Sequence, residues 1–273
     1  MKKIRFWKMS GSGNDFVVVD RRNPLLIEDP SRFAKKVCRR KVSVGADGVL
    51  FLEESKRADF TMRIFNADGS EAEMCGNGAR CIARFAHLQG IAGKAMTFET
   101  PAGIMEAEIN RERVKIKMSE PKDLALHRKI LVEGEEYLLH SVNSGVPHAV
   151  LFCKNLEEVP VQDLGRRIRF HEAFSPAGTN VNFIDVTDSH HISIRTYERG
   201  VEDETLACGT GAVASALASS ALDLVDSPVF LRTRGGEVLV IYFQREGWKF
   251  REVLMEGNTA VAYEGELWEE ALI

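Results

Sequence analysis

The sequence lacks the features that mark membrane, secreted and nucleic-acid-binding proteins. No apolar run approaches the roughly 20 residues that a membrane-spanning helix needs, and residues 1–8 have no apolar signal-peptide core. The net charge is only −4, and Arg21-Arg22 and Arg39-Arg40 are isolated basic pairs. We therefore expect a cytoplasmic protein that binds neither a membrane nor nucleic acid.

Cysteine is scarce and scattered. The five cysteines, at positions 38, 75, 81, 153 and 208, are odd in number and widely spaced, which does not fit a disulfide framework. No second cysteine or histidine lies at the spacing of a zinc site, so we expect no metal. Cys38, Cys81 and Cys153 stand among apolar neighbours and are predicted to be small buried residues.

The other two cysteines lie in near-copies of one phrase. Cys75 begins Cys-Gly-Asn-Gly-Ala, and Cys208 begins Cys-Gly-Thr-Gly-Ala, 133 positions later. The segments that start at Gly45 and Gly178 recur at the same offset, and those at Gly13 and Gly145 recur at an offset of 132. Repetition at this length indicates two homologous domains rather than a solenoid.

Hydrophobic patterning predicts the same order of elements in both halves. Strands are expected at 4–8, 16–20, 49–53, 60–65, 96–100, 104–109 and 114–118, and then at 137–142, 149–152, 181–185, 192–196, 229–233, 238–243 and 249–255. Helices are expected at 30–40, 76–89, 160–170 and 209–222, a linker at 121–128 and a short last strand at 259–263.

The helices that follow Cys75 and Cys208 are apolar on most faces, which predicts burial. The expected fold is therefore mixed α/β, with two homologous domains related by pseudo-two-fold symmetry. Each domain is a curved, mainly antiparallel sheet wrapped around a central helix. We predict one domain from residues 1–118 plus the C-terminal strand 260–273, and the other from 119–259. The two cysteines are expected to meet at the interface between the domains.

A cysteine at a helix start is easily ionised, because the positive end of the helix dipole can lower a thiol pKa to roughly 3.5–7.5. The following glycines let a ligand approach the exposed amides, which form an anion site. One thiolate could remove a proton from carbon while a thiol on the opposite face delivers one, which inverts a stereocentre. A carboxylate held on that carbon by the amides would help to stabilise the developing charge.

Motifs over nearly the whole chain, taken together, resemble the diaminopimelate epimerase family. They are Lys8–Phe16, Gly45–Gly48, Phe65–Ser70, Met74–Arg80, Gly178–Asn182, Tyr197–Val201 and Ala207–Gly211. The resemblance implies interconversion of LL- and meso-2,6-diaminopimelate in lysine and peptidoglycan-precursor synthesis. It also implies that no pyridoxal phosphate or metal cofactor is used, and that the protein is a homodimer.

The resemblance also implies roles for individual residues. Cys75 and Cys208 would be the two bases, and the amides of the residues after them would hold the reacting carboxylate: Gly76, Asn77, Gly209 and Thr210. The far end of the substrate would be bound by Asn14, Asn66, Asn182 and Arg199. Glu198 would contact the substrate and, with His148, influence the thiols. The chain departs from the family pattern at Ser10, Gly48 and Val146, where members often have His, Gln and Asn.

Other functions are compatible with paired cysteines. A proline or hydroxyproline racemase would use the same chemistry, although Glu198-Arg199 and the asparagines favour a substrate with a second polar end. A thiol redox protein could join Cys75 to Cys208, but no Cys-x-x-Cys motif is present. A non-catalytic anion-binding module could use the two helix starts alone.

Overall fold

The computed structural model describes residues 3–23 and 27–272. The chain divides into two compact units, Met1–Ile116 with Gly257–Ile273, and Lys117–Glu256. We call these unit 1 and unit 2. Residues 1–2, 24–26 and 273 of the predicted first domain lie outside the described residues. The predicted limits of the two domains, at 118 and 260, stay predictions.

The described residues of unit 1 form a mixed sheet and two α-helices. Its strands are β1 (Lys3–Gly11), β2 (Asn14–Asp20), β3 (Gly48–Glu53), β4 (Phe60–Asn66), β5 (Glu71–Ala72), β6 (Ala95–Thr100), β7 (Gly103–Asn110), β8 (Arg113–Lys117) and β18 (Ala260–Trp268). Its helices are α1 (Pro30–Val37), α2 (Gly76–Leu88) and the 3-10 turn η4 (Glu269–Leu272). β2–β3 and β4–β6 are parallel pairs, connected through α1 and α2, and the other pairs are antiparallel.

Unit 2 repeats this plan. Its strands are β9 (Lys122–Val132), β10 (Glu135–Asn143), β11 (Pro147–Phe152), β12 (Asn180–Val186), β13 (His191–Glu198), β14 (Asp203–Thr205), β15 (Val229–Arg232), β16 (Val238–Glu246) and β17 (Lys249–Asn258). Its helices are α3 (Val161–Arg169), α4 (Gly209–Ala221) and the 3-10 turns η2 (Leu156–Glu158) and η3 (Glu172–Phe174). The parallel pairs β11–β12 and β13–β15 are connected through α3 and α4, which matches unit 1 and confirms the predicted repeat.

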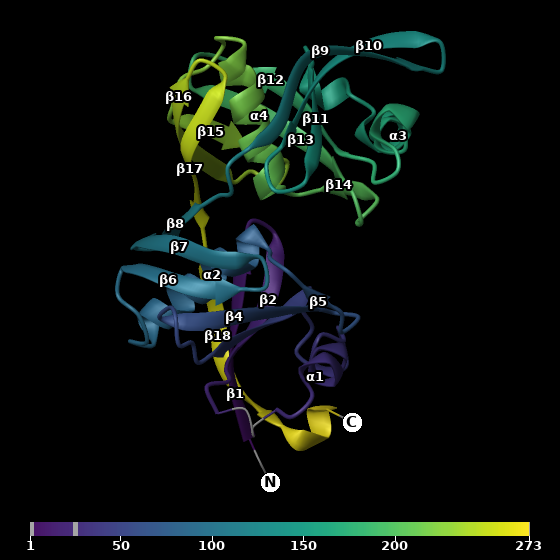
Figure 1. Ribbon diagram of the computed structural model, residues 1–273. Helices are drawn as coiled ribbons and strands as arrows, with labels where there is room; N and C mark the ends of the chain where they lie inside the picture. The colour runs from purple at the N-terminus through teal and green to yellow at the C-terminus, as the bar shows by residue number, and fades with distance from the viewer. Residues whose placement is uncertain (1–2, 24–26, 273) are drawn as a thin grey trace. The chain divides into compact units, whose positions relative to one another are not determined.

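Each unit encloses one buried helix, as the sequence predicts. In unit 2, every residue from Gly211 to Ala221 is buried, and α4 contacts β10, β11, β12, β13, β15 and β16 (Figure 1). In unit 1, α2 buries most of its length and contacts β1, β2, β3, β4 and β7. Small side chains make this possible in α4, because a helix of mostly alanine, glycine and serine lets strands approach on all sides.

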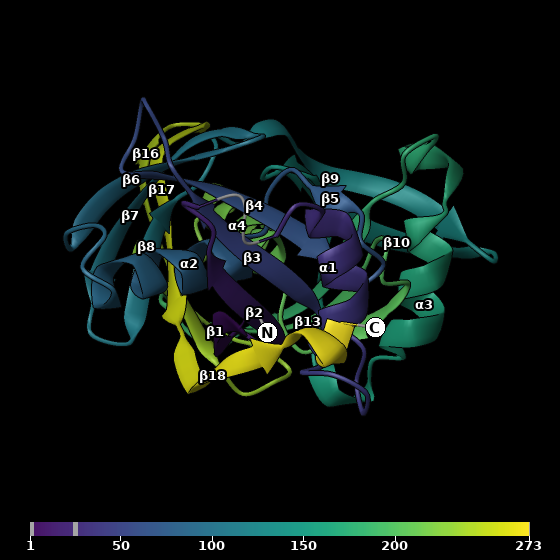
Figure 2. The same cartoon turned by 90° about the horizontal axis from the view of Figure 1, so that it is seen from below.

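Helix α1 begins as its sequence predicts. The Asp29 carboxylate accepts a hydrogen bond from the Arg32 amide at 2.9 Å, and Pro30 occupies the first turn. The helix ends at Val37 rather than at Arg40. Cys38 is its C-cap, and Lys41 adopts a positive φ of 69°, which is not helical. Figure 2 shows α1 beside the C-terminal turn η4, with which it is in contact.

The predicted linker at 121–128 is wrong, because this segment belongs to a strand. β9 runs from Lys122 to Val132 and pairs antiparallel with β10, with irregular register near its start. The sequence of β9 does not alternate regularly between apolar and polar residues, and only Ile130 and Val132 of this strand are buried. Backbone pairing to β10, across a turn in which Glu133 and Gly134 both have positive φ, forms the strand.

Between residues 3 and 272, apart from the undescribed 24–26, no helix has the length and apolar character needed to cross a membrane.

Candidate active site

Cys75 lies at the N-cap of α2, as predicted. Its backbone is extended, with φ −143° and ψ 120°, and its carbonyl accepts the first helical hydrogen bond from Ala79 at 2.8 Å. The residue is half-buried. The amides of the first helical turn have no earlier carbonyl to bond, so the sulfur stands beside donors suited to an anion.

Cys208 has the same position in unit 2. It is the N-cap of α4, with φ −126° and ψ 110°, and its carbonyl accepts from Ala212 at 2.9 Å. The residue is 8% exposed, and its Sγ lies 3.6 Å from Oγ1 of Thr210. The two predicted helix starts are therefore confirmed, each with its cysteine at the same capping position.

In unit 1 the structure brings two of the predicted site residues together. Nδ2 of Asn77 donates to Oδ1 of Asn14 at 2.8 Å. Asn14 in turn donates from Nδ2 to the Asp47 carboxylate at 3.1 Å. Arg80, which is completely buried, donates from Nη2 to Oδ1 of Asn77 at 2.8 Å. From the sequence, no role was assigned to Asp47 or Arg80, although an arginine near the start of a helix predicted to be buried was a visible signal.

An ionic cluster supports the hairpin that carries Asn14. Lys8 and Arg40 each approach the Asp15 carboxylate at 2.7 Å, and Arg40 also reaches Asp47 at 2.9 Å. Burial acts to raise the pKa of Asp15, but hydrogen bonds and positive charge from Arg40 and Lys8 lower it to about 2. Asp15 is therefore ionised near neutral pH, which keeps the β1–β2 hairpin tied to the loop before β3.

Asn66 ends β4 and is exposed. Its Nδ2 donates to Oγ of Ser70 at 3.0 Å, and the next residue, Ala67, donates its amide to the Asp47 carbonyl at 3.1 Å. Asp47 thus joins the segments that carry Asn14 and Asn66. Gly48 lies opposite Asn66 in the β3–β4 register, and a Cβ there would lie 2.8 Å from the Phe65 carbonyl oxygen. The close approach of the two strands explains the glycine.

In unit 2, Asn182 is buried beneath the start of α4. Its Nδ2 contacts Nδ1 of His148 at 3.1 Å and donates to the Ala149 carbonyl at 3.0 Å. Its Oδ1 accepts from the Thr196 hydroxyl at 3.0 Å. Both Nδ2 hydrogens are then donated, so Nδ1 of His148 acts as acceptor and Nε2 carries the imidazole proton. Nε2 is buried and finds no hydrogen-bond partner among the described residues.

His148 is uncharged near neutral pH. Burial, helped by the positive charge of Arg199, lowers its pKa to about 3, although the hydrogen bond with Asn182 acts in the opposite direction. Burial also raises the pKa of Glu198 above its usual value. Unit 2 therefore holds a neutral imidazole and a carboxyl group that resists ionisation, which is typical of functional sites.

Asn180 holds the backbone that carries Arg199. Its Oδ1 accepts from the Arg199 amide at 2.8 Å, and its Nδ2 donates to the Pro147 carbonyl at 3.0 Å. Asn180 is buried, whereas the Arg199 side chain is half-buried and its Nη1 donates to the Ala177 carbonyl at 3.4 Å. Asn180 lies in the Gly178–Asn182 motif, but the family resemblance implied no role for it.

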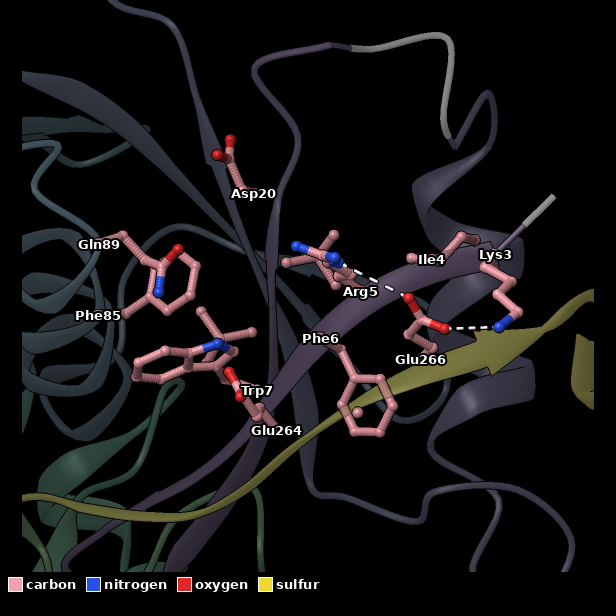
Figure 3. Close-up of a pocket in the computed structure, with 13 residues that line it drawn as sticks. Lys3, Ile4, Arg5, Phe6, Trp7, Asp20, Phe85, Gln89, Glu264 and Glu266 are labelled. Carbon is pink, nitrogen blue, oxygen red and sulfur yellow. Dashed lines mark hydrogen bonds and ion pairs between the residues drawn. The ribbon is translucent and has the colours of Figure 1, made fainter.

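A separate hollow lies over β1, β2, β18 and the end of α2. Its volume is about 730 Å³, and none of the predicted site residues lines it. Figure 3 shows Trp7 against Phe85 in this hollow and Glu266 in ion pairs with both Lys3 and Arg5. Across residues 3–23 and 27–272, no cluster of His, Cys, Asp and Glu side chains is arranged to hold a metal ion.

Comparisons with known proteins indicate the family of this chain. The family model for diaminopimelate epimerase matches residues 6–123 and 140–261. A diaminopimelate epimerase of Aquifex aeolicus is 45% identical over 98% of this chain and 99% of its own length. One of Archaeoglobus fulgidus is 44% identical over 86% of this chain and 88% of its own length.

Solved structures show the same fold at low sequence identity. A phenazine biosynthesis protein of Bacillus anthracis has a TM-score of 0.75 at 18% identity, covering 98% of this chain and all of that chain. A probable proline racemase of Agrobacterium radiobacter has a TM-score of 0.71 at 15% identity, covering 97% and 93%. The full-length sequence matches decide the family: this chain belongs to the diaminopimelate epimerases, and it is an isomerase.

Proposed function

We propose that this enzyme interconverts LL- and meso-2,6-diaminopimelate through a two-base mechanism that uses Cys75 and Cys208. One observation carries the proposal: each unit has a cysteine at the N-cap of its central buried helix, followed by Gly-x-Gly. We further propose that the enzyme serves lysine and peptidoglycan-precursor synthesis, and that the reaction needs neither pyridoxal phosphate nor metal.

In the proposed reaction one sulfur is a thiolate and the other a thiol. The thiolate takes the α-proton of the substrate and becomes a thiol, while the opposite thiol gives its proton to the other face of the same carbon and becomes a thiolate. The centre inverts with no change in total protons, and the roles of Cys75 and Cys208 exchange for the reverse direction. The carboxylate of the reacting centre would be held by backbone amides that follow the two cysteines, those of Gly76 and Asn77 and those of Gly209 and Thr210.

The far end of the substrate would be bound by Asn14, Asn66, Asn182 and Arg199. A guanidinium can grip a carboxylate with two hydrogen bonds, and an asparagine offers a donor and an acceptor together. The Asn182 side chain is already bonded to His148, Ala149 and Thr196, so its contact with a substrate would exchange one of these bonds.

Glu198 and His148 would influence the thiols. A carboxyl group whose pKa is raised by burial can accept a hydrogen bond without placing a full negative charge beside a thiolate. An imidazole that stays neutral, with its proton on Nε2, can donate to a thiolate without forming a tight ion pair. Both arrangements would leave a sulfur basic enough to take a proton from carbon.

Incubation with LL-diaminopimelate in heavy water tests substrate and reaction together. We expect deuterium at the α-carbon and formation of the meso isomer, both unchanged by EDTA and by hydroxylamine, which traps pyridoxal phosphate. Absence of exchange and inversion with reduced cysteines would refute the proposal. Parallel incubations with L-proline and hydroxyproline test the racemase alternative. Activity of a form oxidised to a Cys75–Cys208 disulfide would favour a redox role.

The homodimer and the cytoplasmic location stay predictions. Sedimentation of the purified chain over a range of concentrations measures the first, and cell fractionation measures the second.

A non-catalytic anion-binding module would keep its ligand binding after both cysteines are replaced by alanine, whereas the proposed enzyme would lose turnover.

A further inference from the structure

Arg80 is a charged side chain with no exposed surface, which is unusual. It lies in the second turn of α2, and its relative exposure is 0%. Burying a guanidinium is costly unless its charge and donors are compensated. The compensation at Arg80 consists in part of side chains that belong to the candidate site, which indicates a role there.

The contacts of Arg80 lead directly to Asn77 and the β1–β2 turn. Its Nη2 donates to Oδ1 of Asn77 at 2.8 Å and also to Oγ of Ser12. With Oδ1 occupied by Arg80, Asn77 presents Nδ2 to Oδ1 of Asn14 at 2.8 Å. The guanidinium thereby fixes which end of the Asn77 amide faces Asn14, since a flipped amide would oppose two donors at Arg80 and two acceptors at Asn14.

The hairpin is bonded to the central helix in a different way in unit 2. The position equivalent to Arg80 is Val213, and the serine equivalent to Ser12 is Ser144. Ser144 donates from Oγ to the Thr210 carbonyl at 2.8 Å, so its hairpin is bonded directly to the first turn of α4. In unit 1 a buried cation stands between the hairpin and the helix. The unit with the cation is also the one whose hairpin carries an asparagine, Asn14, at the position of Val146.

We propose that Arg80 is a positioning residue that holds the Asn77 amide, and through it Asn14, in the orientation that binds substrate. The first turn of α2, where the substrate carboxylate would sit, and Asn14, which would bind the far end, are then fixed to each other by one guanidinium. This inference rests on the proposed function for its substrate, but the geometry that it explains lies wholly in unit 1.

Arg84 offers a matched control. It lies one turn further along α2 and is half-buried, and its Nη1 donates to Oγ1 of Thr259 at 3.3 Å and to the Thr259 carbonyl. Arg84→Met removes a guanidinium of the same helix that ties α2 to another part of unit 1. Arg80→Met removes the guanidinium that reaches Asn77 at nearly constant side-chain volume. Arg80→Lys keeps a cation that can donate to two acceptors.

The kinetic experiment compares these three variants with the natural chain on LL-diaminopimelate. We expect Arg80→Met to lower kcat/KM by about tenfold or more, mainly through KM, because small displacements of binding groups are costly. Arg80→Lys should recover part of this loss, and Arg84→Met should stay within about twofold of the natural chain. Equal values for Arg80→Met and Arg80→Lys, or an equal loss in Arg84→Met, would show that packing alone matters and would overturn the proposal.

A second measurement needs no substrate, so it separates this inference from the proposed function. In a Cys208→Ala background, the Cys75 peptide is followed by mass spectrometry during alkylation by anionic iodoacetate and by neutral iodoacetamide. We expect Arg80→Met to lower the iodoacetate-to-iodoacetamide rate ratio about threefold, a size typical of charge effects at a helix start, and Arg84→Met to leave it unchanged. An unchanged ratio in Arg80→Met would overturn the proposal even if the chain epimerises diaminopimelate. A ratio that Arg80→Met lowers and that Arg80→Lys, which keeps the charge, restores only in part would support it even if another amino acid is the substrate. Full restoration by Arg80→Lys would assign the effect to charge alone and would overturn the proposal.

Discussion

Gly211 lies so close to Asn182 that a Cβ on this glycine would stand 2.3 Å from Oδ1 of the asparagine. No Cβ fits at that distance, and Asn182 cannot move aside without losing its bonds to His148 and Thr196. The glycine of the Cys208 phrase is therefore required by a neighbouring strand, and not only by the need of a ligand to reach the helix amides.

Replacement of Gly211 by alanine should destabilise the protein by about 1–3 kcal/mol, the usual cost of overpacking a core. Alanine favours a helix by about 1 kcal/mol relative to glycine, so a stabilised variant would contradict the contact. Chemical denaturation measures the free energy of unfolding.

Gly78, at the matching position of unit 1, is the control for that variant. A Cβ there would meet Cδ2 of Leu50 at 2.9 Å, and the end of a leucine side chain can shift more easily than a bonded amide. We expect Gly78→Ala to cost clearly less than Gly211→Ala. Equal costs would mean that the Asn182 contact is not decisive.

Replacement of either site cysteine by serine should abolish inversion, since a hydroxyl is too weak an acid to supply a base at neutral pH. We expect Cys75→Ser and Cys208→Ser each to lose at least about 10²-fold in turnover, and one of them to retain exchange of the α-proton with heavy water. Cys153→Ser is the control, because Cys153 is a half-buried cysteine that follows β11 and should leave turnover within about twofold. Full turnover in both site variants would exclude the two-base scheme.

Asn180→Ala should weaken substrate binding through Arg199. The variant removes the acceptor for the Arg199 amide and the donor to Pro147, so we expect KM to rise about tenfold with a smaller change in kcat. Asp188→Ala is the matched control, since Asp188 accepts from the amides of two residues just beyond the other end of β12. Steady-state kinetics of both variants decides, and an equal rise in KM would argue for a general loss of structure.

Acid should destabilise the protein as the pH falls below about 6.5, the unfolded value for histidine. Burial lowers the pKa of His148 to about 3, and burial and the charge of His127 lower that of His140 to about 4. The unfolded chain binds more protons than the folded chain in this range. Each of these histidines therefore lowers the free energy of unfolding by about 1.4 kcal/mol for each pH unit of acidification. Urea denaturation between pH 7 and 5 measures the slope, and His140→Gln should reduce it by about one proton. An unchanged slope would contradict the burial of His140.

Local signals predicted much of the fold. The Asp29-Pro30 start of α1, the paired Cys-Gly starts of α2 and α4 and most strands follow from capping residues and apolar periodicity, which act within a few positions of the chain. β9 was missed because its residues are mostly charged or half-exposed, and only pairing with β10 makes them a strand. Pairing energy depends on a partner strand, and no local pattern reports it.

The sequence by itself determined that two copies of one fold each place a cysteine at the start of a buried helix, since the phrase is repeated and the capping signals are local. Only the tertiary structure decided how the surrounding polar groups are bonded. It joined Arg80 to Asn77, and Asn77 to Asn14, which lies 63 positions earlier. It also joined Asn182 to His148, which lies 34 positions earlier. Orientation of an amide and the charge of a buried imidazole depend on partners distant in sequence and on the exclusion of water, and folding alone brings these about.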